Sequence, residues 1–192
     1  RIAQLLSHEF LYKFENILSV PRGKLLEQHI DGSDTIRILH YPPYSGEIKK
    51  DQMRINEHTD YGSITLLWRF DDVPGLQVFD RGKEEWMDVP VVENSIVLNV
   101  GDMLQRWTND LLKSTPHRVI NTEMTRSRYS MPYFVDPGRD VIIDNLTDQT
   151  DKYPPISASE YLKWRLAQSY TDNNYIENED VAVEGSKYIT NY

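Results

Sequence analysis

The chain has 192 residues, which is enough for one substantial domain but not for two of ordinary size. Hydrophobic residues make up 39% and charged residues 27%, a balance that is typical of globular proteins and excludes disorder of the whole chain. The formal net charge of −9 disfavours nucleic acid as a partner, and no apolar run approaches the roughly 20 residues of a membrane span. We therefore expect neither nucleic acid nor a membrane as a partner.

Cysteine is absent from the sequence. This absence excludes disulfide frameworks, thiolate metal sites and a cysteine nucleophile together, so that a metal would be held by histidine and carboxylate. The chain starts at Arg1 rather than methionine, and no positively charged start leads into an apolar signal core. These features predict a fragment or processed chain of a cytoplasmic protein.

The first predicted elements are helical, and those that follow are strands. Apolar residues at helical spacing predict an amphipathic helix over residues 2–18, and a shorter helical piece is expected at residues 24–29. Turns rich in Gly, Pro and Asp then separate about eight short strands, expected at residues 35–41, 56–58, 63–70, 75–79, 95–100, 117–121, 129–135 and 141–143. Gly101-Asp102 is interpreted as a tight turn, and the carboxyl group of Asp136 is expected to face water.

The density of short strands favours antiparallel sheets over alternating βαβ units. We predict a mainly β fold, a double-stranded β-helix (jelly roll) with flanking helices at both ends. The expected segments are an N-terminal helical segment (1–33), a jelly-roll core (34–146) and a C-terminal helix with an acidic tail (147–192). The last helix is expected to be capped by residues 157–160, and the polar tail to begin at Thr171.

Two of the five histidines suggest a metal site. His58 and Asp60 stand two positions apart, so on an extended segment their side chains point to the same side. His117 begins another predicted strand, which a jelly roll can bring back to the first. Two imidazoles and one carboxylate form the facial triad of non-haem Fe(II) oxygenases. From spacing alone, surface residues at a strand end are the alternative, and the other three histidines, His8, His29 and His40, are interpreted as structural or exposed.

An ordered series of motifs gives the triad a context. The series includes Asp60-Tyr61-Gly62-Ser63, Gly75-Leu76-Gln77-Val78, Asn99-Val100-Gly101-Asp102 and His117-Arg118-Val119. Between residues 36 and 137 the sequence resembles the isopenicillin N synthase-like group of Fe(II)/2-oxoglutarate-dependent dioxygenases. This resemblance implies an oxidoreductase that holds Fe(II) through His58, Asp60 and His117 and uses 2-oxoglutarate and dioxygen as cosubstrates.

The resemblance also implies a binding site for the cosubstrate. Arg128 and Ser130 have the same parity on a predicted strand, and in the family this Arg-x-Ser pair binds the distal carboxylate of 2-oxoglutarate. Tyr41 would add a phenolic donor. Without the resemblance, Arg128 would be an ordinary strand-surface residue. Phe134 and Arg37 are predicted to contact the substrate, with core packing and a solvated charge as the respective alternatives.

The predicted activity couples oxidative decarboxylation of 2-oxoglutarate to hydroxylation, desaturation or cyclisation of a small organic substrate. The alternatives are a related iron oxidase that needs no 2-oxoglutarate, a non-catalytic jelly-roll binding module, and a zinc hydrolase that uses the same three ligands. Family members carry an additional N-terminal region. We therefore expect that region, or a second chain, to complete the substrate pocket.

Overall fold

The computed structural model of the chain describes residues 1–49, 52–122, 124–147 and 152–169. The elements within these ranges are α1 (Ile2–Leu18), η1 (Leu26–His29), β1 (Thr35–Ile36), β2 (Leu39–Tyr41), β3 (Ile55–His58), β4 (Ile64–Arg69), β5 (Leu76–Asp80), β6 (Glu85–Asp88), β7 (Ile96–Val100), α2 (Asp102–Trp107), β8 (His117–Val119), β9 (Arg128–Val135), β10 (Ile142–Ile143), β11 (Ile156–Ser157) and α3 (Ala158–Ser169). The predicted mainly β composition with helices at both ends is confirmed. The predicted tail from Thr171 lies outside the described residues.

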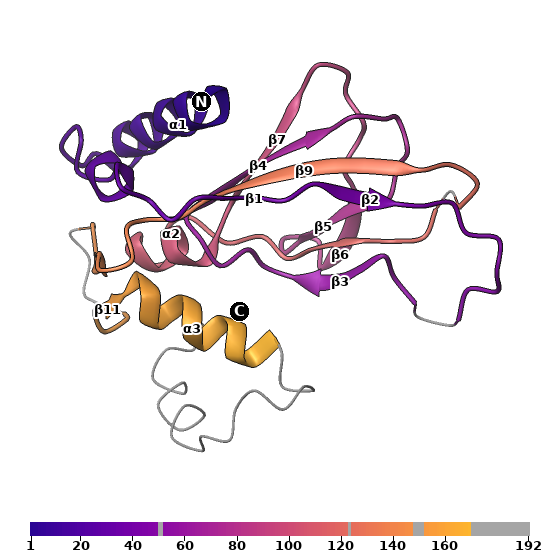
Figure 1. Cartoon of the computed structure of the whole chain (residues 1–192). Coiled ribbons are helices and arrows are strands. Elements are labelled where there is room, and N and C mark those ends of the chain that lie inside the picture. Colours follow the sequence, from indigo (N-terminus) through magenta and orange to yellow (C-terminus); the bar gives the residue numbers. More distant parts are fainter. Residues whose placement is uncertain (50–51, 123, 148–151, 170–192) are drawn as a thin grey trace.

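Two antiparallel sheets form the body of the fold. The larger sheet has the order β1-β9-β4-β7, with β2 also paired to β9, and the smaller has the order β3-β8-β5-β6. Figure 1 shows the larger sheet stacked over the smaller one, with the helices gathered at one end of the strands. None of these helices combines the length and apolar composition needed to cross a bilayer, as far as the described residues extend.

The main hydrophobic core lies on the helix side of the larger sheet. Alternate residues of β4, Ile64 and Leu66, pack there with Trp107 of α2 and Tyr161 of α3. The cluster draws buried residues from all three predicted segments of the chain. Because strand side chains alternate between faces, the intervening residues of β4 point toward the space between the two sheets. That space holds a cavity.

The predicted strand at residues 35–41 is divided into β1 and β2, although its register against β9 is continuous. Thr35 pairs with Phe134 and Leu39 with Ser130, which places Arg37 opposite Pro132. The N–H of Arg37 donates to the carbonyl of Pro132 at 3.1 Å. Proline has no N–H to return, so the ladder is interrupted at this point.

Two turn signals have different outcomes. Ser157 caps α3 as predicted, because its hydroxyl contacts the carboxylate of Glu160 at 2.6 Å and the N–H of Glu160 contacts that hydroxyl at 3.3 Å. Gly101-Asp102 was predicted only as a turn, and this was incomplete. Gly101 is the N-cap of the short helix α2, which begins at Asp102. Strands β6 and β11 were not predicted.

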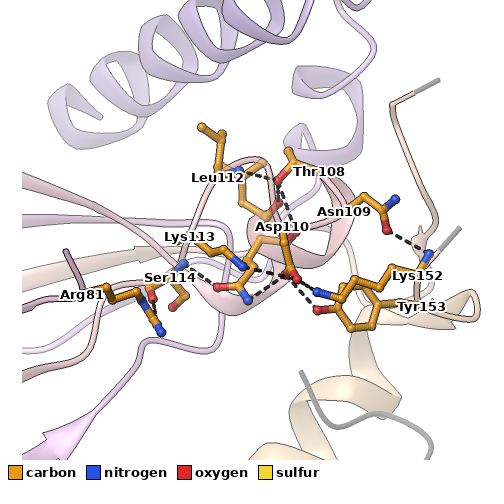
Figure 2. Close-up of polar contacts among 11 residues, drawn as sticks. Arg81, Thr108, Asn109, Asp110, Leu112, Lys113, Ser114, Lys152 and Tyr153 are labelled. Atoms are coloured by element: carbon orange, nitrogen blue, oxygen red, sulfur yellow. Dashed lines mark hydrogen bonds and ion pairs between the residues drawn. The ribbon is translucent and has the colours of Figure 1, made fainter. Parts of the chain in front are cut away.

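The loop between α2 and the His117 strand is held by Asp110. Its carboxylate accepts hydrogen bonds at 2.8 Å from Gln105 Nε2 and from the Tyr153 hydroxyl, and it pairs with the ammonium groups of Lys113 and Lys152 (Figure 2). The side-chain oxygen Oε1 of Gln105 in turn accepts the N–H of Ser114 at 2.6 Å. This network ties the loop leading to His117 to the segment before α3.

Asp110→Ala is expected to lower the free energy of unfolding by about 1–3 kcal/mol, because it leaves the buried Gln105 amide and the Tyr153 hydroxyl without their acceptor. The partner Lys113 is 47% exposed, so Lys113→Met is the control and should cost less than about 1 kcal/mol. Urea unfolding measures both values. Equal effects of the two substitutions would show that Asp110 does not organise the loop.

His29 connects η1 to the start of β4 inside the core. Its side chain is 3% exposed, and its Nδ1 donates to the carbonyl of Leu25 at 2.8 Å. Nε2 lies 2.8 Å from the hydroxyl of Ser63, which can donate to it when the ring is neutral. Burial lowers the pKa of His29 to about 4. The structure therefore confirms a structural histidine here, one that is neutral at physiological pH.

The low pKa of His29 predicts a pH-dependent contribution to stability. Between pH 6.5 and about pH 4 the unfolded chain takes up a proton at this residue while the folded chain does not. The contribution is therefore complete above pH 6.5 and falls by about 3 kcal/mol as the pH approaches 4. We expect the difference in unfolding free energy between the wild type and His29→Gln to shrink by this amount from pH 7.5 to pH 4. A difference that stays constant with pH would contradict the prediction.

Candidate metal centre and adjoining cavities

The structure brings His58, at the end of β3, and His117, at the start of β8, together with Asp60. Each offers one ligand atom, and these atoms lie within 4.8 Å of one another. Asp60 Oδ1 is 4.0 Å from Nε2 of His58 and 3.7 Å from Nε2 of His117. The carboxylate oxygen thus faces both imidazole nitrogens.

A β-bulge sets the register of the two histidines. Ile55 pairs with Val119, but the next pairing is His58 with His117, so β3 carries one extra residue between these pairs. A regular ladder would place Glu57 opposite His117. The bulge re-aims the strand end, which is a common use of bulges near functional sites.

Both imidazoles are oriented by the backbone. Nδ1 of His58 donates to the carbonyl of Asn56 at 2.8 Å, and Nδ1 of His117 donates to the carbonyl of Thr115 at 3.1 Å. A carbonyl oxygen only accepts, so the ring proton sits on Nδ1 in each neutral ring. Nε2 of each ring therefore has a free lone pair on the side of Asp60. This Nδ1–H tautomer is the one that allows Nε2 to bind a metal.

The second carboxylate oxygen of Asp60 is held by its neighbours. Oδ2 accepts hydrogen bonds from Thr65 Oγ1 at 2.6 Å and from Asn99 Nδ2 at 2.8 Å, which leaves Oδ1 directed at the histidines. Sequence reasoning did not assign a role to Thr65 or Asn99. The available signal was that Thr65 and Asn99 are polar residues at inward positions of the otherwise largely apolar strands β4 and β7.

The electrostatics favour a neutral His58. Burial lowers the pKa of His58, and the neighbouring His117 and Arg165 lower it further. A neutral imidazole can donate its lone pair to a metal, whereas a protonated one cannot. Two imidazoles and one carboxylate suit Fe(II), so the residues present fit a non-haem iron site.

A cavity of about 190 Å³ between the sheets adjoins this cluster and brings together the other predicted site residues. Its lining includes Arg128, Ser130, Tyr41, Arg37 and Phe134. The alternation along β9 directs residues 128, 130, 132 and 134 into this space, as the predicted parity requires. Arg128 and Ser130 are each 2% exposed, so Arg128 is not the strand-surface residue of the alternative interpretation.

Arg128 is a buried cation without a counter-ion among the described residues. Its Nη1 atom is buried and has no hydrogen-bond partner within the described ranges. The guanidinium carbon lies 4.9 Å from the centroid of the Tyr41 ring. A buried guanidinium that lacks an anion is costly to the protein alone. This arrangement is suited to an anionic ligand that enters the cavity.

A second cavity, of about 290 Å³, lies on the α3 side of the cluster. It shares Arg37 and Phe134 with the first cavity, and the Arg37 guanidinium lies 5.7 Å from the centroid of the Phe134 ring. Asp136 also lines it and is half-buried, so its carboxyl group is less exposed to water than expected. Burial raises the pKa of Asp136 to about 7, and the nearby carboxyl groups of Asp34 and Asp60 contribute to this rise.

The fold and the cluster define a double-stranded β-helix protein with a candidate two-histidine, one-carboxylate metal centre. The family model of the 2OG-Fe(II) oxygenase superfamily matches residues 33–137. The chain belongs to this superfamily, whose name gives the predicted metal and cosubstrate.

Sequence similarity to individual proteins supports this assignment. The chain is 41% identical over 145 residues to the 2-oxoglutarate-Fe(II) type oxidoreductase hxnY of Emericella nidulans, covering 72% of this chain and 41% of that protein. It is 36% identical to the 2-oxoglutarate-dependent dioxygenase htyE of Aspergillus rugulosus, over 80% of this chain and 51% of the relative. The chain thus spans about half the length of these relatives.

A solved structure shows the same fold. A full-length Neurospora crassa protein, crystallised in complex with alpha-KG and thymine, superimposes with a TM-score of 0.79 at 35% identity. The match covers 88% of this chain and 54% of that protein. The predicted jelly-roll fold is confirmed.

Proposed function

We propose that this chain forms the catalytic core of an Fe(II)/2-oxoglutarate-dependent dioxygenase. His58, Asp60 and His117 would hold the iron, and Arg128, Ser130 and Tyr41 would hold the distal carboxylate of 2-oxoglutarate. The bound metal would supply activation of dioxygen, coupled to oxidative decarboxylation of 2-oxoglutarate and oxidation of the substrate. The observation that carries the proposal is the buried Arg128, which has no counter-ion in the part of the chain that the structure describes, in a cavity that His58, Asp60 and His117 also line.

The chain's own residues orient the reactants and keep water out. The backbone carbonyls of Asn56 and Thr115 hold the imidazole protons on Nδ1, so no ligand nitrogen is blocked by a proton. Apolar side chains from both sheets line the rest of the cavity, among them Leu67, Leu76 and Val97. Such a lining strengthens the attraction between Arg128 and a carboxylate, because it excludes solvent from the pair.

The substrate is proposed to be a small organic molecule in the second cavity. Arg37 and Phe134 border both cavities, which supports their role as substrate contacts beside the metal centre. Among the relatives, the Neurospora crassa protein was solved with thymine and buaE of Petromyces alliaceus is named a proline hydroxylase, both small-molecule associations. Within the superfamily we propose membership of the isopenicillin N synthase-like group, which the ordered motifs from Ile36 to Pro137 support.

The test is oxygen-dependent release of succinate from 2-oxoglutarate by the iron-loaded protein, measured with a panel of small organic substrates. We expect one succinate per 2-oxoglutarate consumed, and product formation that stops when 2-oxoglutarate is omitted. Turnover that needs iron and dioxygen but no 2-oxoglutarate would favour the oxidase alternative. A folded chain that does not bind Fe(II) would favour the binding module.

A further inference from the structure

One side chain of α3 reaches the segment that carries the proposed ligand Asp60. Arg165 lies beside Thr59 and Tyr61, the two residues that flank Asp60. Its Nη2 atom donates to Thr59 Oγ1 at 2.9 Å, and its guanidinium carbon lies 4.7 Å from the centroid of the Tyr61 ring. Arg165 therefore contacts the ligand segment on both sides of Asp60.

Asp102, at the start of α2, holds the same segment from the other direction. Its Oδ2 atom lies 3.0 Å from Arg165 Nη2 and accepts the hydroxyl of Thr59 at 3.2 Å. The backbone N–H of Asp102 donates to the carbonyl of Asp60 at 2.8 Å. The side chains are 1% exposed for Asp102 and 14% for Arg165, so water screens this ion pair little.

A buried ion pair of this kind adds little net stability, because desolvation offsets most of the attraction. Its effect is to restrict geometry. The backbone at residues 59–61 determines where Asp60 Oδ1 points, and that atom must stay close to Nε2 of both His58 and His117. Groups that orient a ligand in this way typically change metal affinity by 10- to 100-fold when they are removed.

We propose that Arg165 is a positioning residue of the metal centre, which couples the C-terminal helix α3 to the His58–Asp60 segment through Thr59, Tyr61 and Asp102. The inference rests on the proposed function, since it requires that Asp60 binds iron. It predicts that loss of the Arg165 guanidinium weakens metal binding even in the chains that remain folded.

The experiment compares Arg165→Met with Lys163→Met, which removes an exposed cation from the same helix. Fe(II) affinity of each chain is measured anaerobically by competition with a chromophoric chelator, and the stability of the metal-free chains is measured by urea unfolding. We expect Arg165→Met to bind Fe(II) 10- to 100-fold more weakly while remaining folded, and Lys163→Met to bind as the wild type does. Arg165→Lys keeps a cation for Asp102 and should give an intermediate affinity.

Thr59→Val provides an independent arm if Arg165→Met fails to fold, because it removes only the hydroxyl that links Thr59 to Arg165 and Asp102. It should weaken Fe(II) binding several-fold. Wild-type affinity in folded Arg165→Met, or in Thr59→Val where that variant must be used, would overturn the inference. So would a loss of 2-oxoglutarate affinity at saturating Fe(II), because that loss would indicate general loosening of the site. If the wild-type chain does not bind Fe(II), that result would instead contradict the proposed function itself.

Discussion

His58→Ala is expected to abolish Fe(II) binding by the folded chain. His58 offers one of the three proposed ligand atoms, and its Nδ1 already donates to the carbonyl of Asn56, so Nε2 is left for the metal in the proposed site. With one imidazole removed, the cluster retains only His117 and Asp60. We expect the affinity to fall by at least 1,000-fold, on the order of 4 kcal/mol. Equilibrium dialysis with Fe(II) under anaerobic conditions measures the change.

The matched control is His40→Ala. His40 is exposed, stacks on Tyr129 with a centroid distance of 4.5 Å, and contacts the hydroxyl of Ser127 at 3.0 Å, outside the cluster. Its removal should leave Fe(II) binding unchanged. Retention of tight Fe(II) binding by His58→Ala, or equal losses in the two variants, would exclude the proposed ligand set.

Arg128→Met is expected to separate cosubstrate binding from folding. Loss of the guanidinium should weaken 2-oxoglutarate binding by about 100- to 1,000-fold, because two charge-assisted hydrogen bonds to a carboxylate disappear. The metal-free variant should be as stable as the wild type or more stable, because an apolar side chain of similar length replaces a buried cation that has no counter-ion within the described ranges. Fe(II) affinity should be retained, because Arg128 is not a ligand.

Isothermal titration with 2-oxoglutarate and urea unfolding measure the two effects. Arg118→Met is the control, since Arg118 bonds to Gln77 at 2.8 Å, stacks on Trp86 and does not line the cavity. A variant Arg128→Met that binds 2-oxoglutarate normally would refute the assignment. A large loss of stability without loss of binding would make Arg128 a structural residue.

The sequence was most informative where strand parity decides which way a side chain points. Arg128 and Ser130 share a face of β9 because they are two positions apart, and the fold places both in the cavity. The same parity relates Arg37 to Tyr41. Spacing and a jelly-roll topology suggested that His117 lies beside His58, and the family resemblance strengthened this prediction.

Other features depend on contacts that local sequence does not encode. The bulge that places His58 opposite His117 depends on the pairing of β3 with β8. The Thr65 and Asn99 contacts to Asp60 join positions 5 and 39 residues away from it. Arg165 meets Thr59 across 106 residues. Hydrophobic periodicity does not predict these contacts, which form only when the sheets and α3 pack together.

The most direct test of the iron assignment is an anaerobic titration of the wild-type chain with Fe(II) in the presence of 2-oxoglutarate. We expect a metal-to-ligand charge-transfer absorption band that saturates at one Fe(II) and one 2-oxoglutarate per chain and is absent in Asp60→Ala. A folded chain that produces no band, or a band that persists unchanged in Asp60→Ala, would contradict the assignment of His58, Asp60 and His117 as the iron ligands.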